Sequence, residues 1–321
     1  MKTLGAHHKA QGGAALLLAM IILTLVSTVA AGMVWQQSRA VQVEAAERAR
    51  TQAVWILNGA LDWGRDIPRL VRSNRAGGPD EPLVIKEMNV SSFLAADQNN
   101  NVDSGLSAFV SGRVVDAQSR YNLRNLIDAE GKINKLEAGT LQRLCEAAGT
   151  PATAELLAAG LLLAWGPAAA DAAPSTPLAP MRVSQLAWLG LDADALERLA
   201  PLIEIMPVRT PVNLNTASRD VMVAVIEGLD LATAERIVQQ RASSAYASLE
   251  DLRTRLRLPD SIKTDPQRVA VMSNYFEVYG QLRVDDRVME ERSLLERRGT
   301  GASAEVVAVR RERRSVRAAA P

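Results

Sequence analysis

The first hydrophobic feature of the chain is an uncharged run from Ala14 to Trp35. About 22 residues at about 1.5 Å each give a helix of about 33 Å, long enough to cross the hydrocarbon core of a bilayer. Lys2 and Lys9 precede the run, and the first charge after it is Arg39. Because basic residues stay on the cytoplasmic side, we expect a single-pass membrane anchor with a cytoplasmic N-terminus and an exported main part.

A helical pattern continues beyond the apolar run. Small and apolar residues recur every three or four positions, at Val41, Ala45, Ala49, Ala53, Leu57, Ala60 and Gly64. This pattern predicts one long helix over residues 14–72, with residues 14–35 in the membrane and Trp35 at its interface. The alternative is a secretory signal peptide cleaved near Val29-Ala30-Ala31, but the apolar run is longer than the hydrophobic segment of such signals.

The helical pattern breaks after Ile67-Pro68, and β-rich segments predict strands at residues 83–90 and 107–115. Polar residues between these strands alternate as in a calcium loop, at Asp97, Asn99, Asn101 and Asp103. Val102 stands where such a loop needs glycine, and Ala108 stands where it needs the closing glutamate. We therefore interpret the segment as a solvated loop.

Residues 136–271 carry mostly helical patterns. We expect helices at 152–165 after Thr150-Pro151, at Ala193–Leu199 after Asp192, at 217–227 after Asn215-Thr216, at 231–241, and after a capping box of Ser248 and Asp251. Residues 273–284 are expected to form a strand, with the segment 293–298 beyond it. Residues 305–314 are either a last strand or a solvated basic tail.

Composition narrows the chemistry. The 321 residues are 48% hydrophobic and 4% aromatic, and the formal net charge of +1 gives no global attraction to nucleic acid. The two histidines are His7 and His8, and the one cysteine is Cys145 within an apolar helical pattern. If the segment before Ala14 is removed from the mature protein, no histidine remains. Ser-His-Asp, Cys-His and histidine-metal sites are then excluded. We predict no catalytic residues, no metal and no cofactor, and a buried Cys145, an intermolecular disulfide being the alternative.

The leader carries a resemblance. A basic segment ending in Gly12-Gly13, followed by Ala14 and a leucine run, is similar to the type III signal of type IV pilins and pseudopilins. The resemblance implies that prepilin peptidase cleaves between Gly13 and Ala14 and that Ala14 is N-methylated. Most members of that class have glutamate at the fifth mature position, which here is Leu18. A subunit without this carboxylate cannot pair with the amine of a subunit above it, which suits a filament tip.

A second resemblance leads to a rival function. Residues 211–218 and the helices after them resemble helix-hairpin-helix modules that bind DNA. In such modules a Gly-x-Gly hairpin contacts phosphate through its backbone amides. Here the hairpin reads Gly228-Leu229-Asp230, and Glu227 adds a second carboxylate beside it. We therefore interpret it as a packing unit and expect no nucleic-acid partner.

Several blocks together resemble the minor pseudopilin K family of the type II secretion system. Besides the leader, these blocks are residues 111–126, 212–218, 273–278 and 293–297. The resemblance implies an α+β pseudopilin fold, a long N-terminal helix packed on a small antiparallel sheet, with a large all-α domain inserted. The expected parts are a leader (1–13), the helix (14–72), the first part of the sheet (73–131), the inserted domain (132–272), the second part of the sheet (273–299) and a basic tail (300–321).

The same resemblance implies a structural role at the tip of a periplasmic pseudopilus, needed for its assembly and for secretion across the outer membrane. The implied partners are the minor pseudopilins I, J and H, the major pseudopilin G, prepilin peptidase and the inner-membrane secretion platform. Many family members have an acidic calcium-binding segment after the residue that matches Trp165. Here that segment contains only Asp171, so calcium is not carried over. The alternative is a minor pilin of a type IV pilus.

Overall fold

A computed structural model describes residues 12–63, 82–89, 108–167, 177–284, 287–299 and 305–317. The chain divides into two units, Met1–Asn58 and Gly59–Pro321, and each is described by itself.

The first unit consists of most of helix α1, Gly12–Trp63. The stretch Leu16–Glu44 contains an 18-residue window with a mean hydropathy of 2.4 and is long and apolar enough to cross a membrane. The hydroxyls of Thr24 and Thr28 donate to helix carbonyls three residues earlier, so they add no unpaired donor to the apolar surface. The expected helix is therefore present as far as Trp63, and its apolar part suggests a single-pass membrane anchor, while residues 64–72 lie outside the described part.

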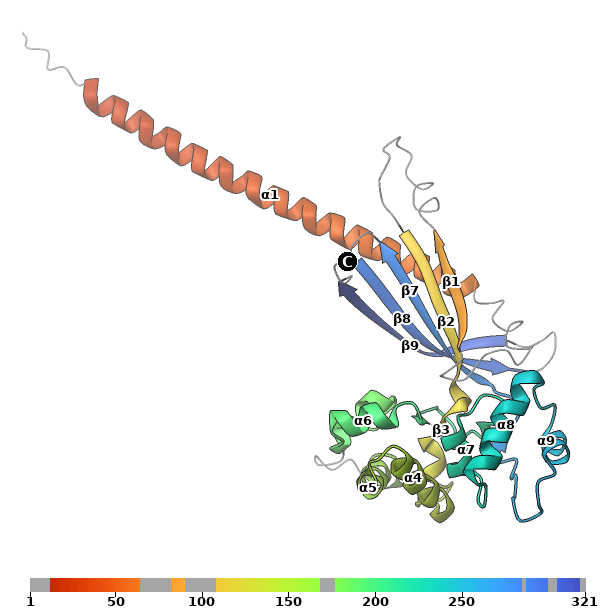
Figure 1. Cartoon of the computed structure of the whole chain (residues 1–321). Helices are drawn as coiled ribbons and strands as arrows, with labels where there is room; N and C mark the ends of the chain where they lie inside the picture. Colours follow the sequence, from red (N-terminus) through yellow and green to blue (C-terminus); the bar gives the residue numbers. More distant parts are fainter. Residues whose placement is uncertain are drawn as a thin grey trace, which may run out of the picture. The chain divides into compact units, whose positions relative to one another are not determined.

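The second unit contains a five-stranded antiparallel sheet with strand order β1-β2-β7-β8-β9 (Figure 1). The strands are β1 (Leu83–Asn89), β2 (Ala108–Asp116), β7 (Tyr275–Val284), β8 (Arg287–Arg298) and β9 (Glu305–Arg317). Val114, Phe276 and Val278 are buried together on one face, and the side chains that alternate with them make the other face polar. Both β-rich segments expected before residue 116 are strands.

The C-terminal segment differs from the expected basic tail. Residues 305–317 form β9, which pairs with β8 from Glu305↔Arg298 to Arg317↔Arg287. The strand alternative is thus confirmed for this segment. Its arginine-rich sequence fits an edge strand, because charged side chains there discourage pairing with other chains.

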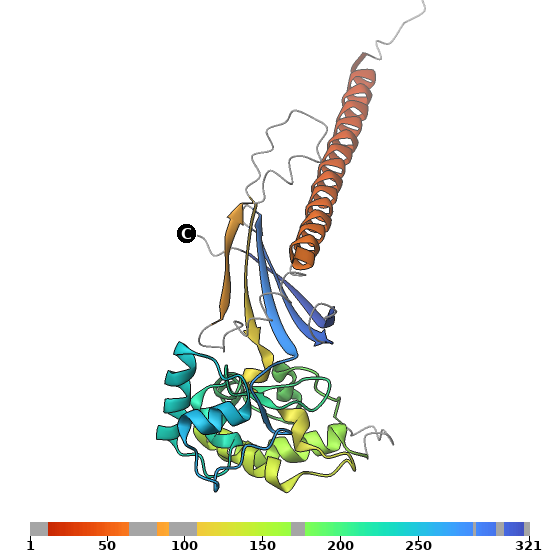
Figure 2. The same cartoon turned by 90° about the vertical axis from the view of Figure 1, so that its right-hand side faces the viewer.

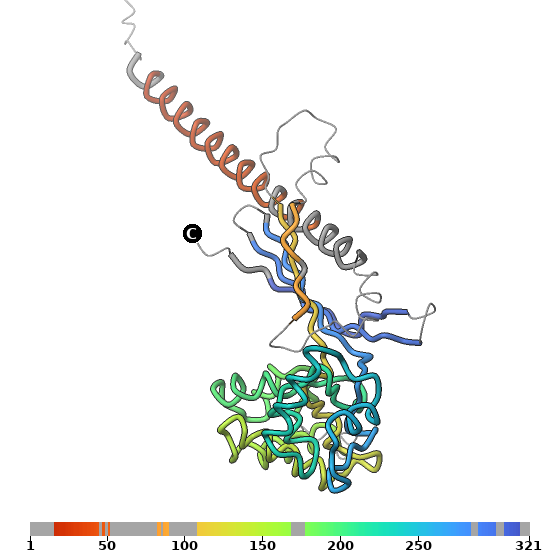
Figure 3. The backbone as a smooth tube through the Cα atoms, turned by 45° about the vertical axis from the view of Figure 1, so that its right-hand side comes forward, coloured from red at the N-terminus to blue at the C-terminus, as the bar shows by residue number. Residues whose placement is uncertain are grey.

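The helical domain is inserted where β2 ends and β7 begins (Figures 2 and 3). Its α-helices are α4 (Lys135–Ala147), α5 (Thr153–Trp165), α6 (Ala193–Leu199), α7 (Arg219–Val225), α8 (Leu231–Ser243) and α9 (Leu249–Leu256). The 3-10 helices are η2 (Ala117–Ser119), η3 (Leu123–Leu126) and η5 (Val183–Leu189). Two parallel strand pairs join β3 (Tyr121–Asn122) to β4 (Ile203–Glu204) and β5 (Val212–Asn213) to β6 (Val269–Ala270).

The insertion starts earlier than residue 132. Leu123 and Leu126 are fully buried in the core of the helical domain, together with Leu141 and Leu144. Asp116 and Phe276 are register partners in the sheet, so the chain leaves and re-enters it at neighbouring points. By packing, residues 117–131 therefore belong to the helical domain.

Two expected helix starts are wrong and three are confirmed. Helix α5 begins at Thr153 because Pro151 and Ala152 form a turn, and the Thr150 hydroxyl donates to the Cys145 carbonyl. Helix α7 begins at Arg219 and ends at Val225, because Ser218 accepts from the Val221 amide as the N-cap. Asp192 caps α6 and Ser248 caps α9, as expected. Helix α8 begins at Leu231, as expected.

Candidate functional site

The residues singled out for processing and membrane insertion all lie in α1. Gly13 and Ala14 belong to its first turn, and the Gly13–Ala14 cleavage remains a prediction. Leu18 and Trp35 expose 61% and 68% of their surface in the isolated chain, and their position in a membrane remains a prediction. Arg39 lies over the Trp35 ring at 5.4 Å, a pairing that suits the membrane–water interface.

Within the described residues, no group of three or more His, Cys, Asp or Glu side chains could hold a metal ion. Asp97, Asp103 and Asp171 lie outside those residues. Cys145 is fully buried, and burial raises the pKa of its thiol to about 11, so the intermolecular disulfide alternative loses support. The Asp230 carboxylate accepts from the Thr233 amide as the N-cap of α8, which fills the place that a phosphate would need.

The most unusual feature of the second unit is a buried ionic cluster between the sheet and the helical domain. Arg120 lies just after η2, Glu204 in β4 and Glu277 in the sheet strand β7. The Arg120 guanidinium forms an ion pair with Glu204 at 2.9 Å and a second one with Glu277. Both glutamates are completely buried, so Arg120 neutralises one carboxylate from each side of the junction.

Two further arginines complete the cluster from the sheet side. Arg292 in β8 donates through Nε to Glu277 at 2.8 Å and lies 3.3 Å from Glu204. Arg310 in β9 lies 3.5 Å from Glu204 and also donates to the backbone carbonyls of Met181 and Ile205. Strand β9 therefore ties the edge of the sheet to the helical domain.

The two glutamates of the cluster respond differently to it. Burial alone would raise the pKa of Glu277, but Arg120 and Arg292 outweigh burial and lower this pKa to about 2. Burial raises the pKa of Glu204, and the negative charge of Glu277 raises it further. These two effects outweigh the attraction of Arg120, so the pKa of Glu204 is raised. Glu277 is thus the carboxylate that the cluster holds ionised.

A second buried group, Asp116, lies at the end of β2. Its carboxylate accepts four hydrogen bonds, from the Gln118 amide and from the side chains of Asn213, Thr216 and Ser273 at 2.6 to 2.8 Å. Burial nevertheless raises the pKa of Asp116. The donors come from the helical domain and from the segment that leads into β7. Asp116 therefore links the segment that leaves the sheet after β2 to the segment that returns to it before β7.

The ionic cluster and Asp116 both link the helical domain to the sheet. No local sequence pattern predicts this ionic cluster, although the sequence contains one signal of it. Asp116 directly follows Val114-Val115 at the end of one predicted strand, and Glu277 lies between Phe276 and Val278 inside another. A charge inside an apolar strand indicates a buried partner.

Calcium is expected not to stabilise the full-length protein in detergent. A bound ion at 100 times its dissociation constant would add about 2.7 kcal/mol to the free energy of unfolding, which a melting curve detects easily. The measurement compares melting temperatures in calcium and in EDTA. A clear rise that EDTA reverses would contradict the prediction and direct attention to Asp97 and Asp103.

Comparisons with known proteins agree with one another. The model of the family described as type II secretion system protein K matches residues 212–272. A protein of that name from Pectobacterium carotovorum subsp. carotovorum is 28% identical over 89% of this chain and 92% of its own length. Another, from Pseudomonas aeruginosa PAO1, is 26% identical over 87% of both. Over most of its length this chain is similar to type II secretion system protein K.

Other relatives extend the comparison. Protein K of Dickeya chrysanthemi is 36% identical over 127 residues, which cover 38% of this chain and 35% of the relative. A chain in the crystal structure of the GspK-GspI-GspJ complex of enterotoxigenic Escherichia coli has the same fold, with a TM-score of 0.60 and 18% identity. The match covers 84% of this chain and 98% of that one. The mixed helix-and-sheet fold expected for a protein K is therefore confirmed.

Proposed function

We propose that the chain is a minor pseudopilin that caps the periplasmic pseudopilus of a type II secretion system. The observation that carries this proposal is the large helical domain, fixed to the sheet by buried ions in a chain similar to protein K. A rigid head of this size fits the free end of a filament better than its packed shaft. Leu18, which leaves no carboxylate for a subunit above, supports the same position.

The role is assembly rather than catalysis. The α1 helix inserts in the inner membrane as a single span with its N-terminus in the cytoplasm, and the Gly59–Pro321 unit stays in the periplasm. The direct partners are the companion minor pseudopilins I and J, because the solved relative is a complex of K with these two proteins. Minor pseudopilin H, the major pseudopilin G, prepilin peptidase and the inner-membrane platform act with it in assembly and processing.

The full-length chain is expected to co-purify with both companions. The three proteins are co-expressed, extracted in a neutral detergent, captured by an affinity tag on this chain and separated by size-exclusion chromatography. One peak with all three proteins is the expected result. Elution of this chain alone at micromolar concentration, while I and J elute together, would refute the tip complex. Omission of J provides the control for the order of assembly.

Processing is expected to require a small residue at position 13. Gly13→Leu should leave the leader attached, because the peptidase must fit the residue before the scissile bond. Mass spectrometry of the mature wild-type protein should find an N-terminus at methylated Ala14. A start near Gly32 would identify an ordinary secreted protein and contradict the filament anchor. Gly12→Ala, one position earlier, is the matched control and should be processed.

A further inference from the structure

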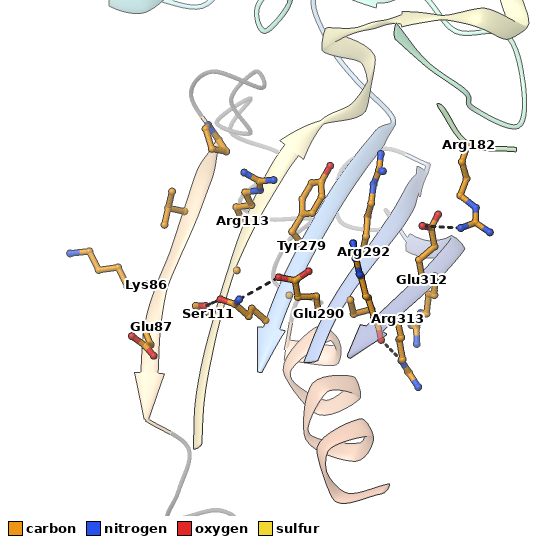
Figure 4. A pocket seen from close by; sticks show the side chains of 18 residues that line it. Lys86, Glu87, Ser111, Arg113, Arg182, Tyr279, Glu290, Arg292, Glu312 and Arg313 are labelled. Atoms are coloured by element: carbon orange, nitrogen blue, oxygen red, sulfur yellow. Dashed lines mark hydrogen bonds and ion pairs between the residues drawn. The ribbon is translucent and has the colours of Figure 1, made fainter. Parts of the chain in front are cut away.

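The polar face of the five-stranded sheet is hollowed beside the helical domain. The hollow has a volume of about 1070 Å³ and is lined by all five strands and by Arg182 (Figure 4). Arg182 immediately precedes η5 and forms an ion pair with Glu312 of β9 at 3.1 Å. The helical domain and the sheet therefore both contribute to the lining.

The strand registers arrange the lining in rows that cross the sheet. The row nearest the helical domain is the buried one, with Glu277, Leu294 and Arg310 in register. The middle row consists of Arg113, Tyr279, Arg292 and Glu312. The outer row consists of Ser111, Gln281, Glu290 and Arg314, and Lys86 lies beside Ser111 at the irregularity in β1. Only the middle and outer rows reach solvent enough to bind a partner.

The lining is basic, and much of its positive charge is not neutralised. Of the 18 lining residues, seven are basic and four are acidic. In the described part of the chain, Arg292 and Arg182 have carboxylate partners, whereas Lys86, Arg113 and Arg314 form no ion pair. Arg113 instead lies over the Tyr279 ring at 4.3 Å. The free cations lie towards the two sides of the sheet, in β1, β2 and β9.

One acidic side chain interrupts this pattern. Glu290 of β8 is exposed, and its only partner in the described residues is Gln281, at 3.5 Å. Along the outer row the charges therefore run positive at Lys86, neutral at Ser111 and Gln281, negative at Glu290 and positive at Arg314. Arg113 adds a positive charge from the middle row, two residues from Ser111 on β2. A ligand that matches this order needs carboxylates at both ends and one basic group between them.

We propose that this face binds an extended acidic peptide segment of a partner protein, lying across the strands. Strands are about 4.8 Å apart, so β1 and β9 are separated by about 19 Å, the span of about six extended residues. Alternate side chains of an extended segment are about 6.8 Å apart and point to the same side. A segment Glu-x-Glu-x-Lys-x-Glu presents its carboxylates to Lys86, Arg113 and Arg314 and its lysine to Glu290. This binding activity goes beyond the capping role.

The test uses the full-length protein in neutral detergent and a fluorescein-labelled peptide, Glu-Thr-Glu-Thr-Lys-Thr-Glu. Fluorescence anisotropy should show saturable binding that weakens as salt rises, because exposed charges are screened. The matched control peptide, Lys-Thr-Glu-Thr-Glu-Thr-Glu, has the same composition. In either direction it places glutamate opposite Glu290 and lysine opposite a cation, so it should bind more weakly.

A triple variant, Lys86→Gln with Arg113→Gln and Arg314→Gln, should bind the first peptide about tenfold more weakly, since three exposed ion pairs are lost together. Arg198→Gln, which removes an exposed arginine of α6, should bind it as the wild type does. Equal binding of the two peptides, no binding of either, or an unchanged triple variant would each overturn the proposal. Neither companion pseudopilin enters this assay, so its failure would leave the capping role standing.

Discussion

Replacement of Arg120 by methionine is expected to reduce the free energy of unfolding by about 3–5 kcal/mol, because it removes a buried ion-pair partner from two buried carboxylates at once. Arg120 is the one cation of the cluster that contacts both Glu204 and Glu277 from the helical side. Arg292 and Arg310 remain, yet each is partly open to water and neither can fill the vacated position. The effect is large because Glu204 and Glu277 have no route to solvent.

Urea unfolding of the full-length protein in detergent, followed by tryptophan fluorescence, measures this loss. Trp165 and Trp188 lie in the helical domain and report on its release. The matched control is Arg198→Met, which breaks an exposed ion pair to Asp194 and should cost less than about 1 kcal/mol. A loss below about 1 kcal/mol for Arg120→Met would show that the cluster does not hold the two domains together. Addition of Glu204→Gln and Glu277→Gln should recover part of the stability, because the unpaired charges are then removed.

The membrane helix and most of the sheet could be predicted because they depend on local patterns. The run from Ala14 to Trp35 determines its own structure through length and hydropathy, and residues 83–89 and 275–284 alternate or carry β-branched side chains. For residues 305–317 the local pattern alone did not distinguish a strand from a solvated tail. An apolar run, Val306–Val309, is followed there by arginine pairs at 310–311 and 313–314. This pattern suits both an edge strand and a solvated tail, and only pairing with β8 decides between them.

The junction could not be predicted, because its energy comes from contacts between distant residues. Arg120 and Glu277 are 157 positions apart in the sequence, and Arg310 and Glu204 are 106 apart. Nothing near Arg120 indicates which of the 36 acidic residues will neutralise it. The wrong helix starts have a related cause. Asn215 donates to the carbonyls of Tyr246 and Val271 instead of capping a helix, so long-range contacts override the local signal.

The second large effect is expected from removal of the helical domain at the boundaries that the packing indicates. Asp116 and Phe276 are register partners, so a short hairpin turn can replace residues 117–274 and still join β2 to β7. Glu277 and Arg292 are then exposed to water, which solvates both charges, so Glu277 no longer needs a buried ion-pair partner. Leu294, which packs with Tyr275 and Met206 at the junction, also becomes exposed and should be changed to Thr.

This headless variant is expected to enter the membrane and to co-purify with pseudopilins I and J, while secretion is lost because the filament end has no head. Deletion of residues 132–272 alone is the informative control. It keeps Leu123 and Leu126 but removes the core around them, so it should aggregate or be degraded. Secretion is assayed as the fraction of an exported protein that reaches the medium, with the full-length chain as reference. Normal secretion by a headless variant that still binds I and J would show that the helical domain is dispensable, and the capping role would then have to be assigned to the sheet and α1.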